Sequence, residues 1–164
     1  MAGKTRGLTK GEIELLREVF GNAISYEKIT LRDGAGANLL ARIAFLNSGN
    51  WAMTYLHTIH FNTGHFREDF SAPGENRSLL VHEATHVWQY SKLGVAHFAV
   101  RYGWNFTSCH FDQHKMYDYG GAEHFKDATI EGQANMVSHY YNERSGRNGE
   151  ALKAKLARTG FYGL

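Results

Sequence analysis

The chain has 164 residues, of which 43% are hydrophobic and 21% are charged, and its formal net charge is +2. This length and composition suit one compact domain with an ordinary core and argue against wholesale disorder. The charge is too weak to indicate nucleic-acid binding. The longest apolar stretch, residues 39–46, contains Arg42 and is far shorter than a bilayer crossing, so we expect no membrane insertion.

The N-terminal segment carries basic residues but no apolar core, so it does not resemble a signal peptide. We therefore expect the protein to be made in the cytoplasm and to need other machinery if it acts elsewhere. We expect residues 1–7 to be flexible and residues 8–164 to form a single domain. The one cysteine, Cys109, excludes an internal disulfide, and His110 beside it gives only a weak indication of a nucleophile pair.

The first predicted helix has clear boundary signals. Thr9 and Glu12 have the T-x-x-E spacing of a capping box. Leu8 and Ile13 can form the hydrophobic staple that accompanies such a box. Gly21 is suited to terminating a helix, so we expect this helix to lie between Thr9 and Gly21.

Short strands are predicted after this helix. Residues 29–31 precede an Asp33-Gly34 turn, and residues 41–45 are a second candidate. Residues 53–61 are the strongest candidate, because β-branched and aromatic residues are frequent there.

The rest of the chain is mainly helical in its pattern. We expect an irregular aromatic segment at residues 103–121 and helices over residues 76–92, 95–102, 124–144 and from Asn148 to just before Gly160. Gly94 is the expected end of the first of these. The order of one helix, several strands and then further helices indicates an α+β fold.

An H-E-x-x-H motif lies in the predicted 76–92 helix, where residues 82–86 read His-Glu-Ala-Thr-His. Residues four apart leave the same face of a helix, so the imidazoles of His82 and His86 can bind one zinc ion. Glu83 is then suited to act as general base toward a water molecule. The opposite face is apolar, as a buried helix requires, through Leu80, Val81, Ala84, Val87 and Trp88. The motif therefore predicts a zinc hydrolase, against the alternative of a chance match.

A catalytic zinc ion needs a third protein ligand from elsewhere in the chain. The metzincin continuation is absent, because Gln89 and Lys92 occupy the positions of its glycine and histidine. We favour Glu131, at the edge of an apolar helical stripe, where zinc would be the partner that a buried carboxylate needs. On spacing alone a solvated glutamate is an equal interpretation, and the other candidate ligands are His97, His110, Asp112, His114, Asp118, His124 and Asp127.

Several strings together resemble a known family. They are LTKGEIELLREVFGNAISYEKITLRDG, AMT, DFS, LLVHEATHVWQY, YDYG and IEGQANMVSHYY, spread from Leu8 to Tyr141. The chain resembles the zincin-like metallopeptidase domains associated with bacterial type VI secretion, some of which are C-terminal extensions of VgrG spike proteins. The motif followed by Val-Trp-Gln is the most specific part of this resemblance.

The resemblance implies a small gluzincin fold, in which a twisted sheet packs on the motif helix and a glutamate helix lies beside it. It implies that zinc is held by His82, His86 and Glu131, the last in an E-x-Q-A context. Residues 95–115 and the Leu56-His57 pair depart from the family pattern, which bears on substrate preference but not on the metal site.

The resemblance also suggests how charge on a substrate oxygen is stabilised. Tyr117 and Tyr119 match a family pattern, and either hydroxyl could meet a developing oxyanion, with His124 as an alternative donor. For both tyrosines, packing under a loop is the competing interpretation. Three residues near Glu131 are candidates for supporting the ligands: Gln133, Asn135 and His139.

A function and a set of partners follow from the resemblance. It implies a zinc-dependent peptidase that is a toxic effector, delivered by type VI secretion into a target cell, with the periplasm as the expected destination. The implied partners are a protein or peptide substrate, a VgrG-type spike and a cognate immunity protein. We expect residues 59–61 to bind extended substrate by strand addition, with an interior strand as an equal alternative.

Three other functions compete with this one. A peptidoglycan amidase or endopeptidase would use the same zinc chemistry. A non-catalytic docking module of a secretion spike would keep the fold, although the intact Glu83 argues against it. A nuclease is disfavoured by the weak charge and by the lack of a carboxylate cluster for two metal ions.

Overall fold

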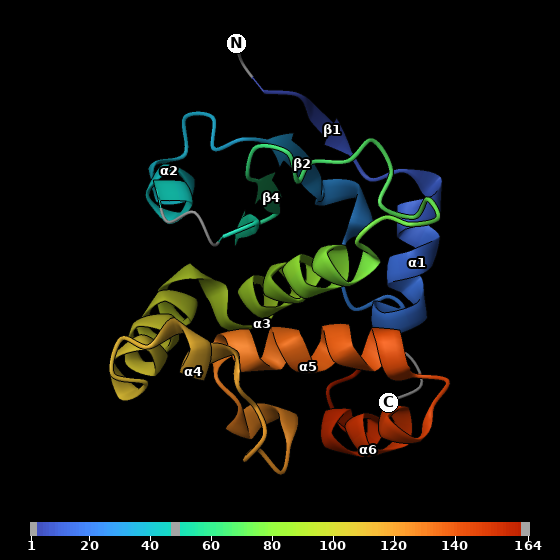
Figure 1. The fold of residues 1–164 in the computed structure, drawn as a ribbon, viewed down its shortest axis with the longest axis vertical. Helices are drawn as coiled ribbons and strands as arrows, with labels where there is room; N and C mark the ends of the chain where they lie inside the picture. Colours follow the sequence, from blue (N-terminus) through green and yellow to red (C-terminus); the bar gives the residue numbers. More distant parts are fainter. Residues whose placement is uncertain (1–2, 47–49, 162–164) are drawn as a thin grey trace.

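The computed structural model describes residues 3–46 and 50–161, and it has an α+β architecture, as predicted. A four-stranded mixed sheet lies on one side of the longest helix, α3, and helix α5 lies along its other side (Figure 1). The sheet has the order β1-β2-β4-β3, in which β2 and β4 are parallel and the outer pairs are antiparallel. Its strands are β1 (Thr5–Gly7), β2 (Thr30–Asp33), β3 (Ala52–Tyr55) and β4 (Thr58–Phe61).

Six α-helices and two short 3₁₀ turns complete the described part of the chain. The helices are α1 (Lys10–Phe20), α2 (Leu39–Leu46), α3 (Arg77–Ser108), α4 (Gln113–Tyr117), α5 (Ile130–Glu143) and α6 (Arg147–Leu156), and the 3₁₀ turns are η1 (Tyr26–Lys28) and η2 (Phe125–Asp127). The α3 helix is central, because it contacts both the sheet and α5.

The start of α1 confirms the predicted capping box. The Thr9 hydroxyl accepts a hydrogen bond from the Glu12 amide, and the Glu12 carboxylate accepts one from the Thr9 amide. The amide of Gly21 closes the other end by donating to the Arg17 carbonyl. These bonds satisfy backbone groups that the helix itself leaves without partners.

The N-terminal segment corrects the expectation that residues 1–7 are flexible. Thr5–Gly7 forms β1, which pairs with β2, while residues 1–2 lie outside the described residues. The cause is an ion pair, because two nitrogens of the Arg6 guanidinium each donate to the buried Glu12 carboxylate at 2.7 Å. Sequence patterns could not show this pair, since its two members were assigned to different segments.

Residues 41–45 form part of α2, so their prediction as a strand is wrong. The side chain of Asn38 accepts a hydrogen bond from the Ala41 amide, and its carbonyl accepts one from Arg42, which together close the first helical turn. Only Ala41 of this helix is buried. Apolar content without a buried face was therefore a misleading signal for a strand.

The predicted single strand over residues 53–61 is a hairpin. Leu56 turns the chain with a φ of 57°, and β3 then pairs antiparallel with β4. Because β4 is paired on both sides, by β2 and β3, the proposed strand addition at residues 59–61 is wrong. The edge strand on this side of the sheet is β3.

The helix after residue 76 is longer than predicted and bends sharply. Asn76 caps its start through a bond from the Leu79 amide, and Gly94 breaks it with a φ of 72° and a ψ of 165°. Beyond Gly94 the chain is helical again as far as Ser108, so part of the expected irregular segment at 103–121 is helical. Glycine adopts this backbone conformation without the clash that a Cβ would cause.

Helix α5 starts later than predicted. Residues 125–127 form η2, and the helix begins after Thr129, whose hydroxyl accepts a bond from the Gly132 amide. This cap places Glu131 in the first turn of α5 instead of in the middle of a long helix.

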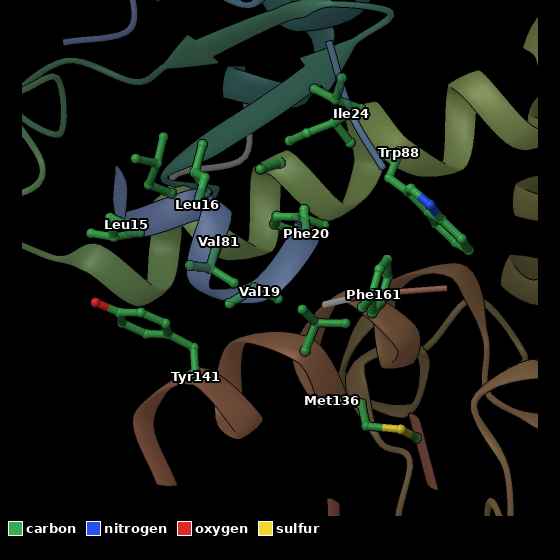
Figure 2. Packing of buried hydrophobic residues seen from close by; sticks show 14 of the residues in the cluster. Leu15, Leu16, Val19, Phe20, Ile24, Val81, Trp88, Met136, Tyr141 and Phe161 are labelled. Atoms are coloured by element: carbon green, nitrogen blue, oxygen red, sulfur yellow. The ribbon is translucent and has the colours of Figure 1, made fainter. Parts of the chain in front are cut away.

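The hydrophobic core lies where α1, the first half of α3, α5 and the C-terminal segment meet (Figure 2). Phe161 packs edge-on against Trp88 and Phe20, with ring centroids 4.9 and 5.2 Å apart. Val81, on the same helix face as Trp88, is fully buried. The apolar face of α3 is thus fixed in this core, and its opposite face carries the histidines.

Candidate metal centre

His82, His86 and Glu131 come together between α3 and α5. The Nε2 atoms of the two histidines are 3.2 Å apart, and each is 3.2 Å from Oε2 of Glu131. Four tetrahedral ligands at ordinary zinc distances are about 3.3 Å from one another, so this triangle has the size of one face of such a site. The donor set of two imidazoles and a carboxylate is one that zinc binds in catalytic sites.

Among residues 3–46 and 50–161, this is the group of metal-binding side chains that the fold assembles. The other candidate third ligands from the sequence do not join it: His97, His110, Asp112, His114, Asp118, His124 and Asp127. Asp112 and Asp127 instead cap short helical turns, which accounts for their positions in the sequence.

The three ligands form a charged cluster in the absence of metal. Burial alone would lower the pKa of His86, but the neighbouring Glu131 carboxylate, together with Glu83 and the bond to Gln89, outweighs it and raises that pKa to about 9. For Glu131, burial acts to raise the pKa, and the adjacent His86 and His82 reverse this and hold it well below its usual range. Metal binding to these side chains therefore competes with protonation of His86.

Glu83 lies beside the triangle and is held by the sheet. Its carboxylate Oε2 accepts a hydrogen bond of 2.7 Å from the hydroxyl of Thr54 on β3. Both side chains are buried, with exposed fractions of 4% for Glu83 and 6% for Thr54. Sequence reasoning did not identify Thr54, although it lies in the AMT string that contributed to the resemblance.

A cleft of about 330 Å³ opens onto His82 and Glu83. Its walls come from the start of β3, the first turns of α3, the end of α4 and the outer face of α5. The remaining lining residues are Asn50, Trp51, Ala52, Asn76, Ser78, Leu79, Tyr117, Asn135, Ser138, His139 and Asn142. A substrate in this cleft would reach the triangle from the side of His82, because His86 and Glu131 lie deeper.

Tyr117 and Tyr119, which the sequence analysis considered together as oxyanion donors, have different partners in the structure. The ring of Tyr117 stacks on His82, with centroids 5.9 Å apart, and it lines the cleft. Burial and the Glu131 carboxylate raise the pKa of Tyr117, so its phenol remains a hydrogen-bond donor. Tyr119 is instead bonded to His139 at 2.6 Å and does not line the cleft.

The buried side of the centre contains Gln133, which the sequence analysis named as a supporting candidate, together with Gln89 and Phe98, which it did not. Gln89 bonds to the ring of His86, and Gln133 bonds to Gln89. Phe98, from beyond the Gly94 bend, has its ring centroid 6.1 Å from that of His86. The sequence signal for the two glutamines was their presence in the V-W-Q and E-x-Q-A strings.

Comparisons with known proteins find a family and a structure that are similar to this chain. Residues 15–94 match the family described as the eCIS core domain, a stretch that contains His82, Glu83 and His86 but not Glu131. The effector domain of Pseudomonas aeruginosa VgrG2b has a similar structure, with a TM-score of 0.68. The two are 27% identical, over 93% of this chain and 82% of that chain. No curated protein matches the sequence.

None of the described helices combines the length and hydropathy needed to cross a bilayer. Sequence similarity over residues 15–94 and structural similarity over most of the chain relate this protein to the effector-like domains of type VI and other contractile injection systems.

Proposed function

We propose that this protein is a zinc-dependent peptidase that serves as a toxic effector of a type VI or related contractile injection system. The observation that carries the enzymatic part is the triangle of His82, His86 and Glu131, whose three donor atoms are each 3.2 Å from the other two. The similarity to the VgrG2b effector domain supports the effector part.

The roles of the side chains follow from their positions. A zinc ion held by the triangle would supply a Lewis acid that polarises a peptide carbonyl and makes water more acidic. Glu83 takes the proton from the attacking water and delivers it to the leaving amine. Thr54 holds the Glu83 carboxylate by its hydrogen bond. Tyr117, as a neutral phenol beside His82, donates to the carbonyl oxygen as negative charge develops there.

The substrate in this proposal lies in the cleft between β3 and α5. Since β3 is an edge strand with no further strand beside it among the described residues, its outer backbone groups can pair with an extended peptide. Trp51 and Ala52, at the start of this strand, line the same cleft as Glu83.

A cell-wall amidase or endopeptidase is the second candidate, and one feature of the cleft favours it. Six of the lining residues are asparagine or serine: Asn50, Asn76, Asn135, Asn142, Ser78 and Ser138. Five of them also bond within the protein, but all six are polar and uncharged, which suits the hydroxyl and amide groups of a glycan-linked peptide.

The first experiment measures zinc in purified wild-type protein and in the His86→Ala and Glu131→Ala variants. We expect about one zinc ion per wild-type chain and its loss from both variants. Retention of zinc by Glu131→Ala would remove that residue from the proposed ligand set. A wild-type protein that takes up no zinc after reloading would contradict the enzymatic proposal and favour a docking module of a spike.

The second experiment uses Glu83→Gln, which keeps the ligands but removes the base. We expect zinc content to be unchanged and hydrolysis to fall by about 10²–10⁴-fold. Casein and purified cell-wall sacculi as parallel substrates distinguish a protein-directed peptidase from a wall hydrolase. Expression in the periplasm should be toxic for the wild type and harmless for Glu83→Gln, and equal toxicity of the two would contradict a catalytic effector.

A further inference from the structure

We infer that Gln89 is a positioning residue, which selects the ligand nitrogen of His86 and anchors the turn that carries Glu131. This inference rests on the proposed function, because it concerns the proposed zinc ligands. Gln89 is fully buried and lies on α3, three residues after His86. Its role was not apparent from the H-E-x-x-H motif, which ends at His86.

The side chain of Gln89 makes three hydrogen bonds in the core. Its Oε1 is 2.8 Å from Nδ1 of His86. Its Nε2 donates to the carbonyl of Ile130 at 3.0 Å and to Oε1 of Gln133 at 2.9 Å. The amide thus uses both its donor protons and its acceptor on three partners from two helices.

The direction of these bonds is fixed by groups that can only accept. The carbonyl of Ile130 has no proton, so the Gln89 atom beside it must be the NH₂ group. In the same way, Gln133 donates from Nε2 to the carbonyl of Ala128, which leaves its Oε1 to accept from Gln89. The atom of Gln89 that faces His86 is therefore its oxygen.

This orientation determines which nitrogen of His86 carries a proton. An amide oxygen accepts, so Nδ1 of His86 must be the donor. In the neutral ring the lone pair is then on Nε2, the atom that lies 3.2 Å from both His82 Nε2 and Glu131 Oε2. Gln89 thereby presents the correct nitrogen to the metal, and as a neutral amide it adds no charge beside Glu131.

The same side chain also fixes the other half of the centre. Ile130 and Gln133 lie one residue before and two residues after Glu131, in the first turn of α5. By donating to both, Gln89 holds that turn at a set distance from His86. The loss of Gln89 would release both contacts at once and would leave the Oε1 atom of Gln133 and the Nδ1 proton of His86 without this partner.

The test measures zinc affinity by chelator competition in the full-length protein. Gln89→Met removes the polar groups at similar side-chain length, and we expect zinc binding about 10- to 100-fold weaker than in the wild type. Gln89→Glu retains an acceptor for Nδ1 of His86 but loses the donors to Ile130 and Gln133, so it should recover only part of that loss. Thr85→Val is the matched control, because this buried hydroxyl bonds only to the Val81 carbonyl of its own helix, and its affinity should equal that of the wild type.

A second measurement follows the ring protons by NMR in the zinc-loaded wild type, and it does not depend on any variant folding. The Nδ1 proton of His86 should exchange slowly with solvent. That of His82 should exchange faster, because no hydrogen-bond partner for this Nδ1 is found among the described residues. Equal exchange of the two protons, or a folded Gln89→Met protein with wild-type affinity, would overturn the inference. Absence of zinc from the wild type would overturn the proposed function itself, so the two failures are distinguishable.

Discussion

The hydroxyl of Thr54 donates a hydrogen bond of 2.7 Å to the carboxylate of Glu83, and this bond links the edge strand β3 to the motif helix. The contact orients the proposed base from outside its own helix. It also means that one short strand both borders the cleft and holds the proposed base.

Removal of this hydroxyl should affect catalysis without affecting the metal. Hydrogen bonds to charged groups contribute about 1.5–3 kcal/mol, so Thr54→Val should lower kcat/KM by roughly 10- to 100-fold. Thr54→Ser should retain most activity, because it keeps the hydroxyl. Kinetic assays with parallel zinc analysis check this, and a loss of zinc from Thr54→Val would assign Thr54 a structural role instead.

The two tyrosines should respond differently to loss of their hydroxyls. Tyr117→Phe keeps the ring stacked on His82 but removes the proposed donor, so we expect kcat to fall by about 10²–10³-fold. Tyr119 does not line the cleft, and Tyr119→Phe removes only its bond to His139, so this variant should have little effect. Similar activities for the two variants, measured on one substrate, would exclude Tyr117 as the oxyanion donor.

The ion pair of Arg6 and Glu12 should contribute strongly to stability. Glu12 is fully buried, so Arg6→Ala removes its cationic partner and leaves only the Thr9 and Phe70 amides bonded to this carboxylate; the free energy of unfolding should fall by about 3 kcal/mol. The exposed pair of Lys4 and Glu68 is the control, and Lys4→Ala should cost at most about 1 kcal/mol. Urea denaturation of the two variants tests this contrast, which would fail if their midpoints shifted equally.

His60 should make the folded state less stable in mild acid. Burial lowers the pKa of His60 in the folded protein, against the opposing effect of its bond to the Gly34 carbonyl, and Arg32 lowers it further. The unfolded chain therefore binds more protons just below its own histidine pKa of about 6.5. The contribution of neutral His60 to the stability of the folded state is therefore fully present above that pH. It is lost as the pH falls toward the lower pKa that His60 has in the folded protein.

The measurement for His60 compares urea unfolding of the wild type and His60→Gln between pH 7 and pH 5. The glutamine variant should lose less stability over this range, because its amide does not titrate. His86 is present in both proteins, and its contribution to the pH dependence of stability has the opposite sign in the absence of metal. This contribution cancels when the two proteins are compared. An identical pH dependence for the two proteins would contradict the prediction.

Sequence patterns indicated correctly those helix boundaries and breaks that depend on a few neighbouring residues. The capping box at Thr9, the cap at Asn76 and the break at Gly94 are each contained within a few neighbouring residues. The assembly of Glu131 with the two histidines was favoured by the resemblance, and spacing alone did not select it among the candidates. The positions of the side chains in the structure select Glu131 among the candidates, which the spacing of residues in the sequence did not do.

The sequence was misleading where long-range pairing decides the structure. Residues 41–45 have the composition of a strand, but they form a helix whose first turn is closed by Asn38. The hairpin at Leu56 was missed because a non-glycine residue occupies the left-handed turn position. The contacts of Thr54 and Gln89 depend on how β3 and α5 lie against α3, which no single segment encodes.

Because α3 bends at Gly94, both halves of this one helix contribute side chains to the centre. Residues before the bend supply both histidines, and Phe98 just after it turns back against the ring of His86. The bend at residue 94 therefore brings the second half of the helix back against the deep side of the centre. A side chain at that position would favour a straighter helix and withdraw Phe98 from His86. It would also withdraw Asn105, whose side-chain oxygen accepts a hydrogen bond from the Ile130 amide beside Glu131.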